Sequence, residues 1–251
     1  MTKITLVTGA SRGLGRNAAL SIARAGGDVI LTYQSRAEDA QAVVAEIESM
    51  GRKAVALQLD TGNIAAFAGF AERLGETLGA VWNCATFDHL VNNAGHGEYA
   101  PIGQTTEIQF DGLVNVHFKG VLFLAQALLP LIADGGRIVN LSSGLTRTAF
   151  PGYAAYAAVK GAVEVLTRYM AKELGARGIA VNTVAPGAIE TDFGGGGVRD
   201  NPEINRLFAD MTALGRVGVP DDIGPMIASL LSVDNRWVNA QRIEVSGGQG
   251  I

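Results

Sequence analysis

The sequence predicts an α/β protein whose parallel sheet is covered by helices on both faces. Short apolar runs alternate with longer stretches of helical periodicity along all 251 residues. The first apolar run ends in a glycine-rich turn that leads directly into a helix, and polar residues or glycines follow several later runs. In such sheets, ligands bind beyond the carboxyl ends of the strands. No linker or change of composition divides the chain, so we expect one domain, residues 1–251.

The first apolar run, residues 3–8, is followed by glycines in the spacing G-x-x-x-G-x-G and by a helix that stops at Gly26-Gly27. Glycine lets backbone N–H groups approach a pyrophosphate, and the N-terminus of a helix favours its negative charge. We therefore expect a dinucleotide-binding turn here. The residues expected to contact the dinucleotide are Gly9, Ser11, Arg12, Gly13, Leu14 and Gly15.

The alternation of strands and helices continues to the end of the chain. Further strands are expected at residues 29–33, 53–59, 89–91, 137–141, 179–184 and 242–245. Helices are expected at residues 37–50, 64–78, 107–131, 153–174 and 220–231. Strands that alternate with helices form right-handed βαβ units, so their carboxyl ends meet at one edge of the sheet. The residues at or just past those ends are Gly9, Tyr33, Asp60, Asn92, Ser143 and Pro186.

The segment 189–212 has no firm periodicity until about Pro202 and contains four consecutive glycines, Gly194 to Gly197. Four glycines carry a large entropy cost of ordering. Two interpretations remain open: the glycines are the hinge of a lid over a substrate, or the segment is a solvent loop.

Tyr156 and Lys160 are four residues apart and therefore lie on one face of a helix. A nearby cation lowers the pKa of a phenol from its usual value of ~10 by favouring the phenolate. A tyrosine with a lowered pKa exchanges protons at neutral pH. Ser143 ends the preceding strand and is placed to direct its hydroxyl at the same substrate oxygen. Taken alone, the Tyr156–Lys160 spacing also fits an ordinary surface pair.

Composition argues against several other classes of protein. The net charge of -4 without a basic run argues against nucleic-acid binding. The apolar run 120–133 contains Gln126 and Pro130 and is too short to span a bilayer. The first strand begins at once without a signal peptide, so we expect a soluble cytoplasmic protein. Cys84 is the only cysteine, which excludes an internal disulfide. The histidines lack the spacing of metal ligands and are expected to be structural: His89, His96 and His117.

Together these motifs resemble the short-chain dehydrogenase/reductase family, in its compact branch of about this length. The resemblance covers essentially the whole chain. It rests on the turn Thr8–Gly15, on Asn92-Asn93-Ala94-Gly95, and on Ser143 thirteen residues before Tyr156, with Lys160 following. The resemblance implies a doubly wound Rossmann fold with a seven-stranded parallel sheet in the order 3-2-1-4-5-6-7.

The resemblance also implies hydride transfer between a nicotinamide and a carbonyl or alcohol carbon. Tyr156 would be the general acid and base, and Ser143 would donate a hydrogen bond to the reacting oxygen. Lys160 would lower the pKa of Tyr156 and hold the nicotinamide ribose, while Asn115 would hold a water relay from Lys160 to solvent. The other implied cofactor contacts are Tyr33, Arg36, Asp60, Asn92, Ala94, Gly95, Pro186, Gly187, Ile189 and Thr191. Plausible substrate contacts, each equally consistent with simple packing, are His96, Tyr99, Leu145, Phe150, Tyr153 and Phe193.

Two departures from the family pattern bear on the cofactor and on the last turn of the chain. Members that prefer NAD carry an acidic residue at the end of the second strand, and this chain has Tyr33 there. Arg12 lies in the glycine turn and Arg36 just past the second strand, where both can reach a 2′-phosphate of the cofactor. We therefore expect NADP(H) to be preferred over NAD(H). Ala240 stands where the family usually has glycine.

The substrate is less well indicated than the reaction. The best-known substrates of the family are 3-oxoacyl groups on acyl carrier protein, and such reductases tend to be basic just before the strand at residue 137. This chain has Asp134 there, with only Arg177 to contribute positive charge. A nucleotide-sugar epimerase would need a larger C-terminal domain. A non-catalytic nicotinamide-binding regulator, the remaining alternative, would not need Ser143, Tyr156 and Lys160 together.

The helices at residues 107–131 and 153–174 are apolar nearly all round. A sheet covers only one face of a helix, so the other face needs a second partner. We therefore expect a homotetramer built through these helices and the last strand, as the family resemblance implies.

Overall fold

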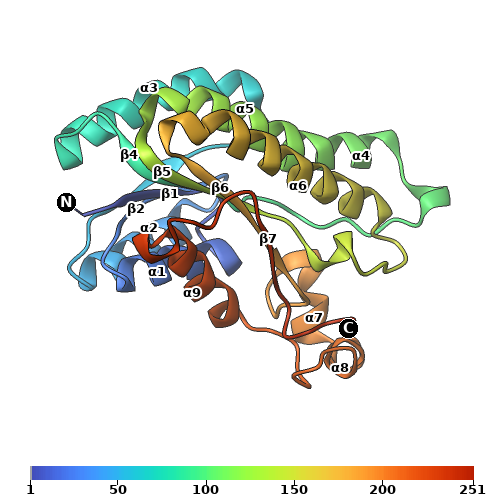
Figure 1. Cartoon of the computed structure of the whole chain (residues 1–251). Coiled ribbons are helices and arrows are strands. Elements are labelled where there is room, and N and C mark those ends of the chain that lie inside the picture. The colour runs from blue at the N-terminus through green and yellow to red at the C-terminus, as the bar shows by residue number, and fades with distance from the viewer. Residues whose placement is uncertain (1) are drawn as a thin grey trace.

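A computed structural model describes residues 2–251 of the chain (Figure 1). Seven strands form one parallel sheet in the order β3-β2-β1-β4-β5-β6-β7, which confirms the predicted fold class and strand order. The strands are β1 Ile4–Val7, β2 Asp28–Tyr33, β3 Ala54–Gln58, β4 Phe87–Asn92, β5 Ile132–Leu141, β6 Ala180–Pro186 and β7 Arg242–Val245.

Helices cover both faces of the sheet (Figure 1). On one face lie α1 Gly13–Arg24, α2 Ala37–Ser49 and α9 Pro220–Leu231. On the other face lie α3 Phe67–Thr77, α4 Glu107–Val114, α5 Gly120–Leu128 and α6 Ala154–Leu174. Two short helices, α7 Gly197–Asp200 and α8 Pro202–Asp210, lie below the end of β7 in the view of Figure 1.

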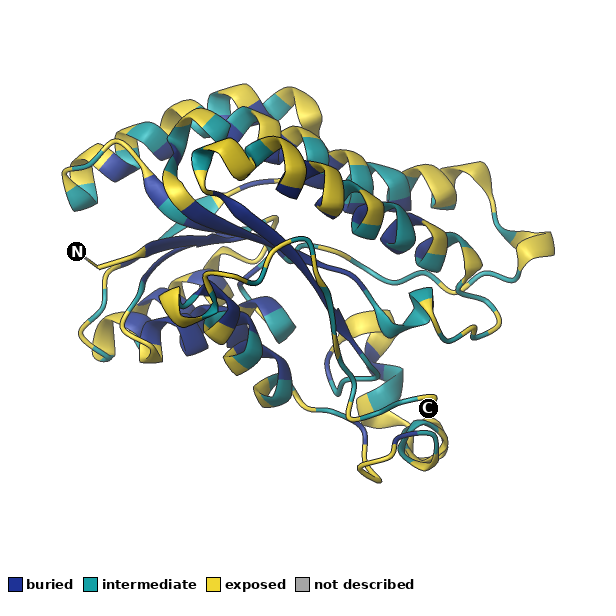
Figure 2. Cartoon of the chain, in the orientation of Figure 1, coloured by how far each residue is buried: buried dark blue, intermediate teal, exposed yellow. Residues whose placement is uncertain are grey.

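The central strands are buried on both sides, as the dark blue sheet in Figure 2 shows. Val7 and Leu31 belong to the core cluster under α1, α2 and α9, whereas their neighbours Leu6 and Ile30 belong to the cluster under α3, α5 and α6. Because successive side chains of a strand point to opposite faces, a strand with two covered faces must be apolar throughout. This explains the continuous apolar runs of the sequence.

The helix expected at residues 107–131 is continuous but not uniform. A π-helical turn, Asn115–Lys119, joins α4 to α5, and a short 3-10 turn ends the helix at Leu131. By length and composition alone, Glu107–Leu131 would be long and apolar enough to cross a membrane. In the fold it is a core helix, because one stripe of its side chains is buried against the sheet and α6. That stripe is Leu113, His117, Val121, Leu124 and Leu128.

Two segments differ from the sequence prediction. β5 begins at Ile132, five residues before the expected strand, and its pairing with β4 shifts register between Phe87 and His89. Helical periodicity was expected only from about Pro202, but helix α7 already begins at Gly197, directly after glycines with positive φ. Ala240, which stands where the family usually has glycine, adopts a positive φ of 59° in this turn.

Candidate active site

A cavity of about 490 Å³ lies beyond the carboxyl ends of the central strands. Its volume falls within the usual range for small-molecule and cofactor sites, ~300–1,000 Å³. The structure brings most of the predicted site residues to this cavity, from segments far apart in the sequence. Those that line it are Gly9, Ser11, Arg12, Gly13, Leu14, Gly15, Tyr33, Arg36, Asp60, Ala94, Gly95, His96, Ser143, Tyr156, Lys160, Pro186, Gly187, Ile189, Thr191 and Phe193.

The turn after β1 has the shape of a dinucleotide cradle. Gly9 and Gly13 have φ values of +63° and +56°, which L-residues with side chains rarely adopt. A Cβ on Gly15 would lie 2.4 Å from both the Asn93 Nδ2 atom and the Gly9 carbonyl oxygen. A Cβ on Gly13 would meet nothing within 4 Å, so that side of the turn is open. The turn is therefore closed toward the protein and open toward the cavity, where α1 begins.

The two asparagines after β4 have different partners. Asn92 was expected to contact a cofactor, but its Nδ2 donates to Asn140 Oδ1 at 2.8 Å inside the sheet, and it does not line the cavity. The sheet pairs β4 with β5, and this bond crosses that pair. Asn93 lines the cavity instead, and its Nδ2 donates to the Thr8 carbonyl oxygen at 2.9 Å. The segment after β4 therefore holds the glycine turn in place through the Asn93 side chain.

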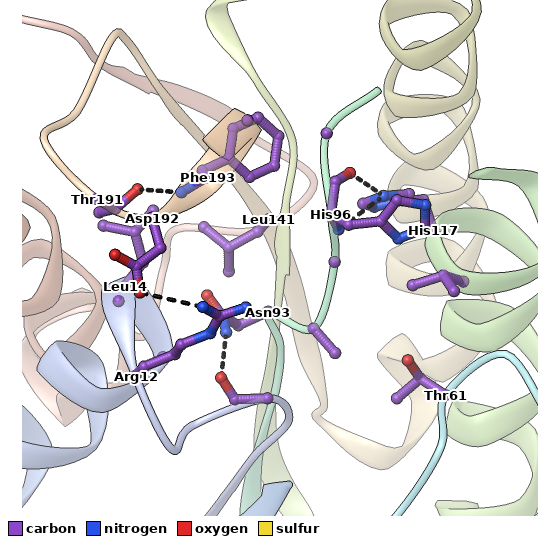
Figure 3. A pocket seen from close by; sticks show the side chains of 18 of the residues that line it. Arg12, Leu14, Thr61, Asn93, His96, His117, Leu141, Thr191, Asp192 and Phe193 are labelled. Atoms are coloured by element: carbon purple, nitrogen blue, oxygen red, sulfur yellow. Dashed lines mark hydrogen bonds and ion pairs between the residues drawn. The ribbon is translucent and has the colours of Figure 1, made fainter. Parts of the chain in front are cut away.

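Two arginines, Arg12 and Arg36, line the cavity together with Tyr33. Arg12 Nη1 is 3.1 Å from Asp192 Oδ2, and Arg36 Nη1 is 3.2 Å from Asp39 Oδ2. Both guanidinium side chains are about half exposed, so they can exchange these partners for a phosphate. Figure 3 shows Arg12 and Asp192 joined on the side of the cavity that also carries Thr191 and Phe193.

Ser143, Tyr156 and Lys160 meet at the opposite wall. Tyr156 and Lys160 are buried on the first turns of α6, with exposed fractions of 5% and 4%. Lys160 Nζ donates to the Leu141 carbonyl oxygen at 2.8 Å and lies 5.8 Å from the centre of the Tyr156 ring. Ser143 follows β5, and its Oγ accepts from the Leu145 N–H at 3.2 Å. The end of β5 and one face of α6 thus set a hydroxyl, a phenol and an amine around one space.

The pKa values correct the expectation that Lys160 lowers the pKa of Tyr156. Burial raises the pKa of the Tyr156 phenol above its ordinary value, although a hydrogen bond with Ser143 acts in the opposite direction. Burial also lowers the pKa of Lys160 from 10.5 to about 7. Desolvation disfavours the charged form of both groups, and a lysine that is half neutral near pH 7 stabilises a phenolate weakly. In this structure Tyr156 is therefore a protonated phenol, and Lys160 is the group that titrates near neutrality.

A partly buried ion-pair network supports the Ser143 loop on the side away from the cavity. Glu164 on α6 accepts from Ser142 Oγ at 2.6 Å, from Thr146 Oγ1 at 2.7 Å and from Arg242 Nε at 2.7 Å. Arg242 on β7 also donates to the Ser143 carbonyl oxygen at 3.2 Å. Burial raises the pKa of Glu164, but these hydrogen bonds and the Arg242 charge outweigh burial and keep the pKa below its usual value. The network was not predicted, because Glu164 and Arg242 are 78 residues apart.

The structure does not bring Asn115 to the cavity. Its Oδ1 accepts from Lys119 Nζ at 2.9 Å on the exposed side of the π-helical turn. His117, which was expected to be merely structural, lines the cavity with 1% of its surface exposed. Its ring packs edge-on against Tyr156, with the centroids 5.4 Å apart. The sequence did indicate that His117 is buried, because it is four residues from both Leu113 and Val121 and so falls on the buried stripe of the helix.

The predicted substrate residues divide into two groups. His96 and Phe193 line the cavity, whereas Tyr99, Leu145, Phe150 and Tyr153 do not. Three of the latter form an aromatic chain with Phe208, in which Tyr99 packs on Tyr153, Tyr153 on Phe150 and Phe150 on Phe208. Phe193 packs against Tyr156 within the cavity wall, with the two ring centroids 5.5 Å apart. The cavity therefore has an aromatic wall next to the phenol.

Comparisons with known proteins agree with this geometry. The profile of the family described as Enoyl-(Acyl carrier protein) reductase matches residues 9–249. An uncharacterized oxidoreductase of Methylorubrum extorquens is 37% identical over 98% of this chain and 97% of its own. The hydroxynaphthalene reductase-like protein Arp2 of Metarhizium brunneum is 35% identical over 98% and 94%. The crystal structure of the angucycline C-6 ketoreductase LanV with bound NADP superimposes with a TM-score of 0.93 at 35% identity, over 99% of this chain and 95% of LanV.

Proposed function

The chain belongs to the short-chain dehydrogenase/reductase family, and from this premise we propose that it is an NADP(H)-dependent oxidoreductase that interconverts a carbonyl and an alcohol. The observation that carries the proposal is the cavity itself. A glycine turn suited to a pyrophosphate and the Ser143, Tyr156 and Lys160 side chains face the same space. A binding protein without turnover would need only the glycine turn.

The cofactor supplies or accepts a hydride, and the protein handles the proton and the charge. As a carbonyl carbon gains the hydride, negative charge grows on its oxygen. Tyr156, held as a protonated phenol, gives its proton to that oxygen, and the Ser143 hydroxyl donates a hydrogen bond to it. Lys160, with a pKa of about 7, is suited to return a proton to Tyr156. In the reverse direction Tyr156 takes the proton of the alcohol.

The preference for NADP(H) is supported by the residues at the end of β2. Tyr33 puts no negative charge beside the adenosine ribose, and Arg12 and Arg36 line the same end of the cavity. A 2′-phosphate would replace Asp192 and Asp39 as their partners. The LanV structure, which contains NADP, supports the same choice.

We expect the substrate to be an aromatic ketone or quinone. Phe193 lines the cavity and packs against Tyr156, so the wall beside the phenol favours flat apolar rings. The relatives named for hydroxynaphthalene and angucycline reduction act on fused aromatic rings by their names. A carrier-bound 3-oxoacyl group is the weaker alternative, because Arg177 is paired with Asp134 at 2.7 Å and leaves no free basic patch there.

The test follows NADPH oxidation with a panel of carbonyl compounds: 2-tetralone, 1,4-naphthoquinone, a 3-oxoacyl thioester and an enoyl thioester. We expect turnover with 2-tetralone or the quinone to exceed turnover with either thioester. Faster reduction of the enoyl thioester would point instead to the reaction named in the family description. No NADPH oxidation with any of the four would favour the non-catalytic regulator.

We also propose a cytoplasmic homotetramer in which partner subunits cover the outer faces of α4–α6. The exposed apolar side chains of these helices are Ile108 and Phe110 on α4, Phe123 on α5, and Val165 and Tyr169 on α6. Apolar surface on two adjacent helices is typical of an interface. A monomeric mass by light scattering at micromolar concentration would contradict this assembly.

The segment 189–212 is proposed to be a lid over the substrate. Gly194, Gly195 and Gly196 all have positive φ values, so this stretch has backbone freedom that other residues lack. Asp192 tethers it to Arg12 of the glycine turn and, at 2.6 Å, to Arg199 of α7. A phosphate on Arg12 would release the first tether, which links cofactor binding to the position of the lid.

A further inference from the structure

We propose that Glu164 and Arg242 are positioning residues for Ser143. They hold its hydroxyl beside the Tyr156 phenol, where both groups reach one substrate oxygen. This inference rests on the proposed function and adds two residues to it. Neither residue lines the cavity, so both act through the loop that carries Ser143.

Helix α6 presents three functional side chains along one face. Tyr156, Lys160 and Glu164 follow one another at intervals of four residues, which places them in a row. The first two line the cavity, whereas the Glu164 carboxylate lies one turn further on and contacts the loop after β5. Eight residues span about 12 Å of helix, a distance that backbone hydrogen bonds fix. The phenol and the anchor of the loop therefore keep a constant separation.

The backbone of the loop after β5 is only weakly tied to the sheet. The Ser142 N–H donates to the Val184 carbonyl oxygen at 2.8 Å, where the pairing of β5 with β6 ends. A 3-10 turn, Gly144–Thr146, follows Ser143. Among residues 2–251, the backbone bonds of residues 143–148 stay within this turn, and 3-10 turns have poorer hydrogen-bond geometry than α-helices. The position of the Ser143 hydroxyl therefore depends on side-chain contacts.

Glu164 and Arg242 supply those contacts on both sides of Ser143. The Glu164 Oε1 atom accepts from Ser142 Oγ at 2.6 Å and from Thr146 Oγ1 at 2.7 Å. The Arg242 Nη2 atom donates to the Ser143 carbonyl oxygen at 3.2 Å and to Thr146 Oγ1 at 3.0 Å. Arg242 Nε also donates to Glu164 Oε1 at 2.7 Å, so the two residues act as one unit.

The orientation of Ser143 matters for the chemical step. Its Oγ accepts from the Leu145 N–H, which leaves its own proton to be donated, and it is hydrogen-bonded to the Tyr156 phenol. A donor held in place before the reaction stabilises the growing negative charge without reorganisation. Because hydrogen bonds weaken steeply with misalignment, a displaced loop would slow the chemical step. Cofactor binding, which depends on the glycine turn, would be unaffected.

The ion pair also stabilises the fold, so its two roles have to be separated. The side chains of Glu164 and Arg242 are 15% and 11% exposed. Arg242→Met leaves the Glu164 carboxylate without its cation, which is destabilising for a largely buried charge, whereas apolar replacement of both partners leaves no such charge. Glu244 keeps Arg147 as a partner at 3.5 Å when Arg242 is lost. The double variant Glu164→Leu/Arg242→Met should therefore regain stability but lose the hold on the loop completely.

Stability and activity should move in opposite directions between these variants. The thermal midpoint should fall in Arg242→Met and recover in the double variant. We expect kcat to fall about threefold to tenfold in Arg242→Met and about tenfold to a hundredfold in the double variant. The latter is part of the roughly 10²–10³ that one donor to the reacting oxygen is worth. KM for NADPH should change little in either. Recovery of kcat together with the midpoint would show a merely structural role and overturn the inference.

A matched control breaks a different partly buried ion pair. Arg52 Nη2 lies 2.8 Å from Asp28 Oδ1 at the amino end of β2, and neither residue lines the cavity. Arg52→Met should lower the thermal midpoint and leave kcat unchanged. An equal loss of kcat in Arg52→Met and Arg242→Met would mean that loss of stability alone lowers turnover, and that result would also contradict the inference.

A final comparison tests whether the pair acts through Ser143. The assay is NADPH oxidation with 2-tetralone, or with the panel carbonyl that wild type reduces fastest. In a Ser143→Ala background the double variant should lose less than about threefold in kcat, because the hydroxyl that it misplaces is already absent. Equal fold losses with and without Ser143 would overturn the inference. Full turnover in Tyr156→Phe would refute the proposed function, whereas loss there with wild-type kcat in the double variant would refute this inference alone.

Discussion

The two walls of the cavity are made of different parts of the protein. The wall after β1 is backbone: a Cβ on Gly9 would lie 2.9 Å from the Ala94 Cα, and a Cβ on Gly15 would collide with the Asn93 side chain and the Gly9 carbonyl oxygen. The opposite wall is side chain: Ser143, Tyr156, Lys160 and His117 project from β5, α6 and the π-helical turn. A backbone wall tolerates little change but performs no proton chemistry. A side-chain wall does the chemistry and depends on burial and on the phase of each helix.

The largest expected effect is on the side-chain wall. Tyr156→Phe removes the proton donor but keeps the ring, so turnover should fall by roughly 10²–10⁴, the usual worth of a positioned acid. NADPH affinity, measured by fluorescence titration, should change little. Tyr169→Phe, exposed on the same helix, is the control. Near wild-type turnover in Tyr156→Phe would show that Tyr156 is not the proton donor and that the side-chain wall does not carry out the proton chemistry through it.

The next effect concerns the adenosine end of the backbone wall, where two arginines add side-chain specificity. Two hydrogen bonds to a charged phosphate, each worth about 1.5–3 kcal/mol, give a preference for NADPH of roughly 10²-fold, less some loss to exposure. We expect wild type to favour NADPH in kcat/KM, and Tyr33→Asp/Arg36→Ala to lose most of that bias. Equal or better use of NADH by wild type would show that Arg12 and Arg36 do not read the phosphate.

A smaller effect separates two glycines of the same turn. Gly15→Ala places a Cβ 2.4 Å from backbone and should weaken NADPH binding by roughly tenfold or more, with a lower thermal midpoint. Gly13→Ala meets no atom within 4 Å and carries only the strain of its positive φ, about 1 kcal/mol. If Gly13→Ala were the more damaging variant, close packing would not be what makes this wall intolerant.

At a fixed pH near 7, the smallest effect is a pH dependence of the side-chain wall. Reduction needs Lys160 as the ammonium, and burial lowers its pKa to about 7. The protonated fraction therefore falls as pH rises through 7, and kcat/KM for NADPH in the reduction should decline by up to tenfold per pH unit above it. Tyr156 adds no decline in this range, because its pKa is raised. A flat profile from pH 6 to 9 would mean that Lys160 is not the group that titrates.

The contrast between the walls also explains what the sequence could predict. The fold, the strand order and the glycine turn follow from apolar periodicity and glycine spacing, which are local properties. The side-chain wall was predicted only in part. Asn115 was expected at the cavity, whereas the structure places His117 there, on the buried stripe through Leu113 and Val121. The raised pKa of Tyr156 and the Glu164–Arg242 pair depend on burial and on contacts between distant segments, which no local pattern contains.

The central claim is that the cavity transfers a hydride to a carbonyl carbon with Tyr156 as the proton donor. The most direct test gives the enzyme NADPH that carries deuterium at both C4 positions, with 2-tetralone or the best panel carbonyl, and locates the label in the product by mass spectrometry and NMR. We predict one deuterium on the carbinol carbon, formed by wild type at a rate that Tyr156→Phe lowers by roughly 10²–10⁴. Oxidation of the cofactor with no deuterium on that carbon, or labelled alcohol formed by Tyr156→Phe at the wild-type rate, would contradict the account.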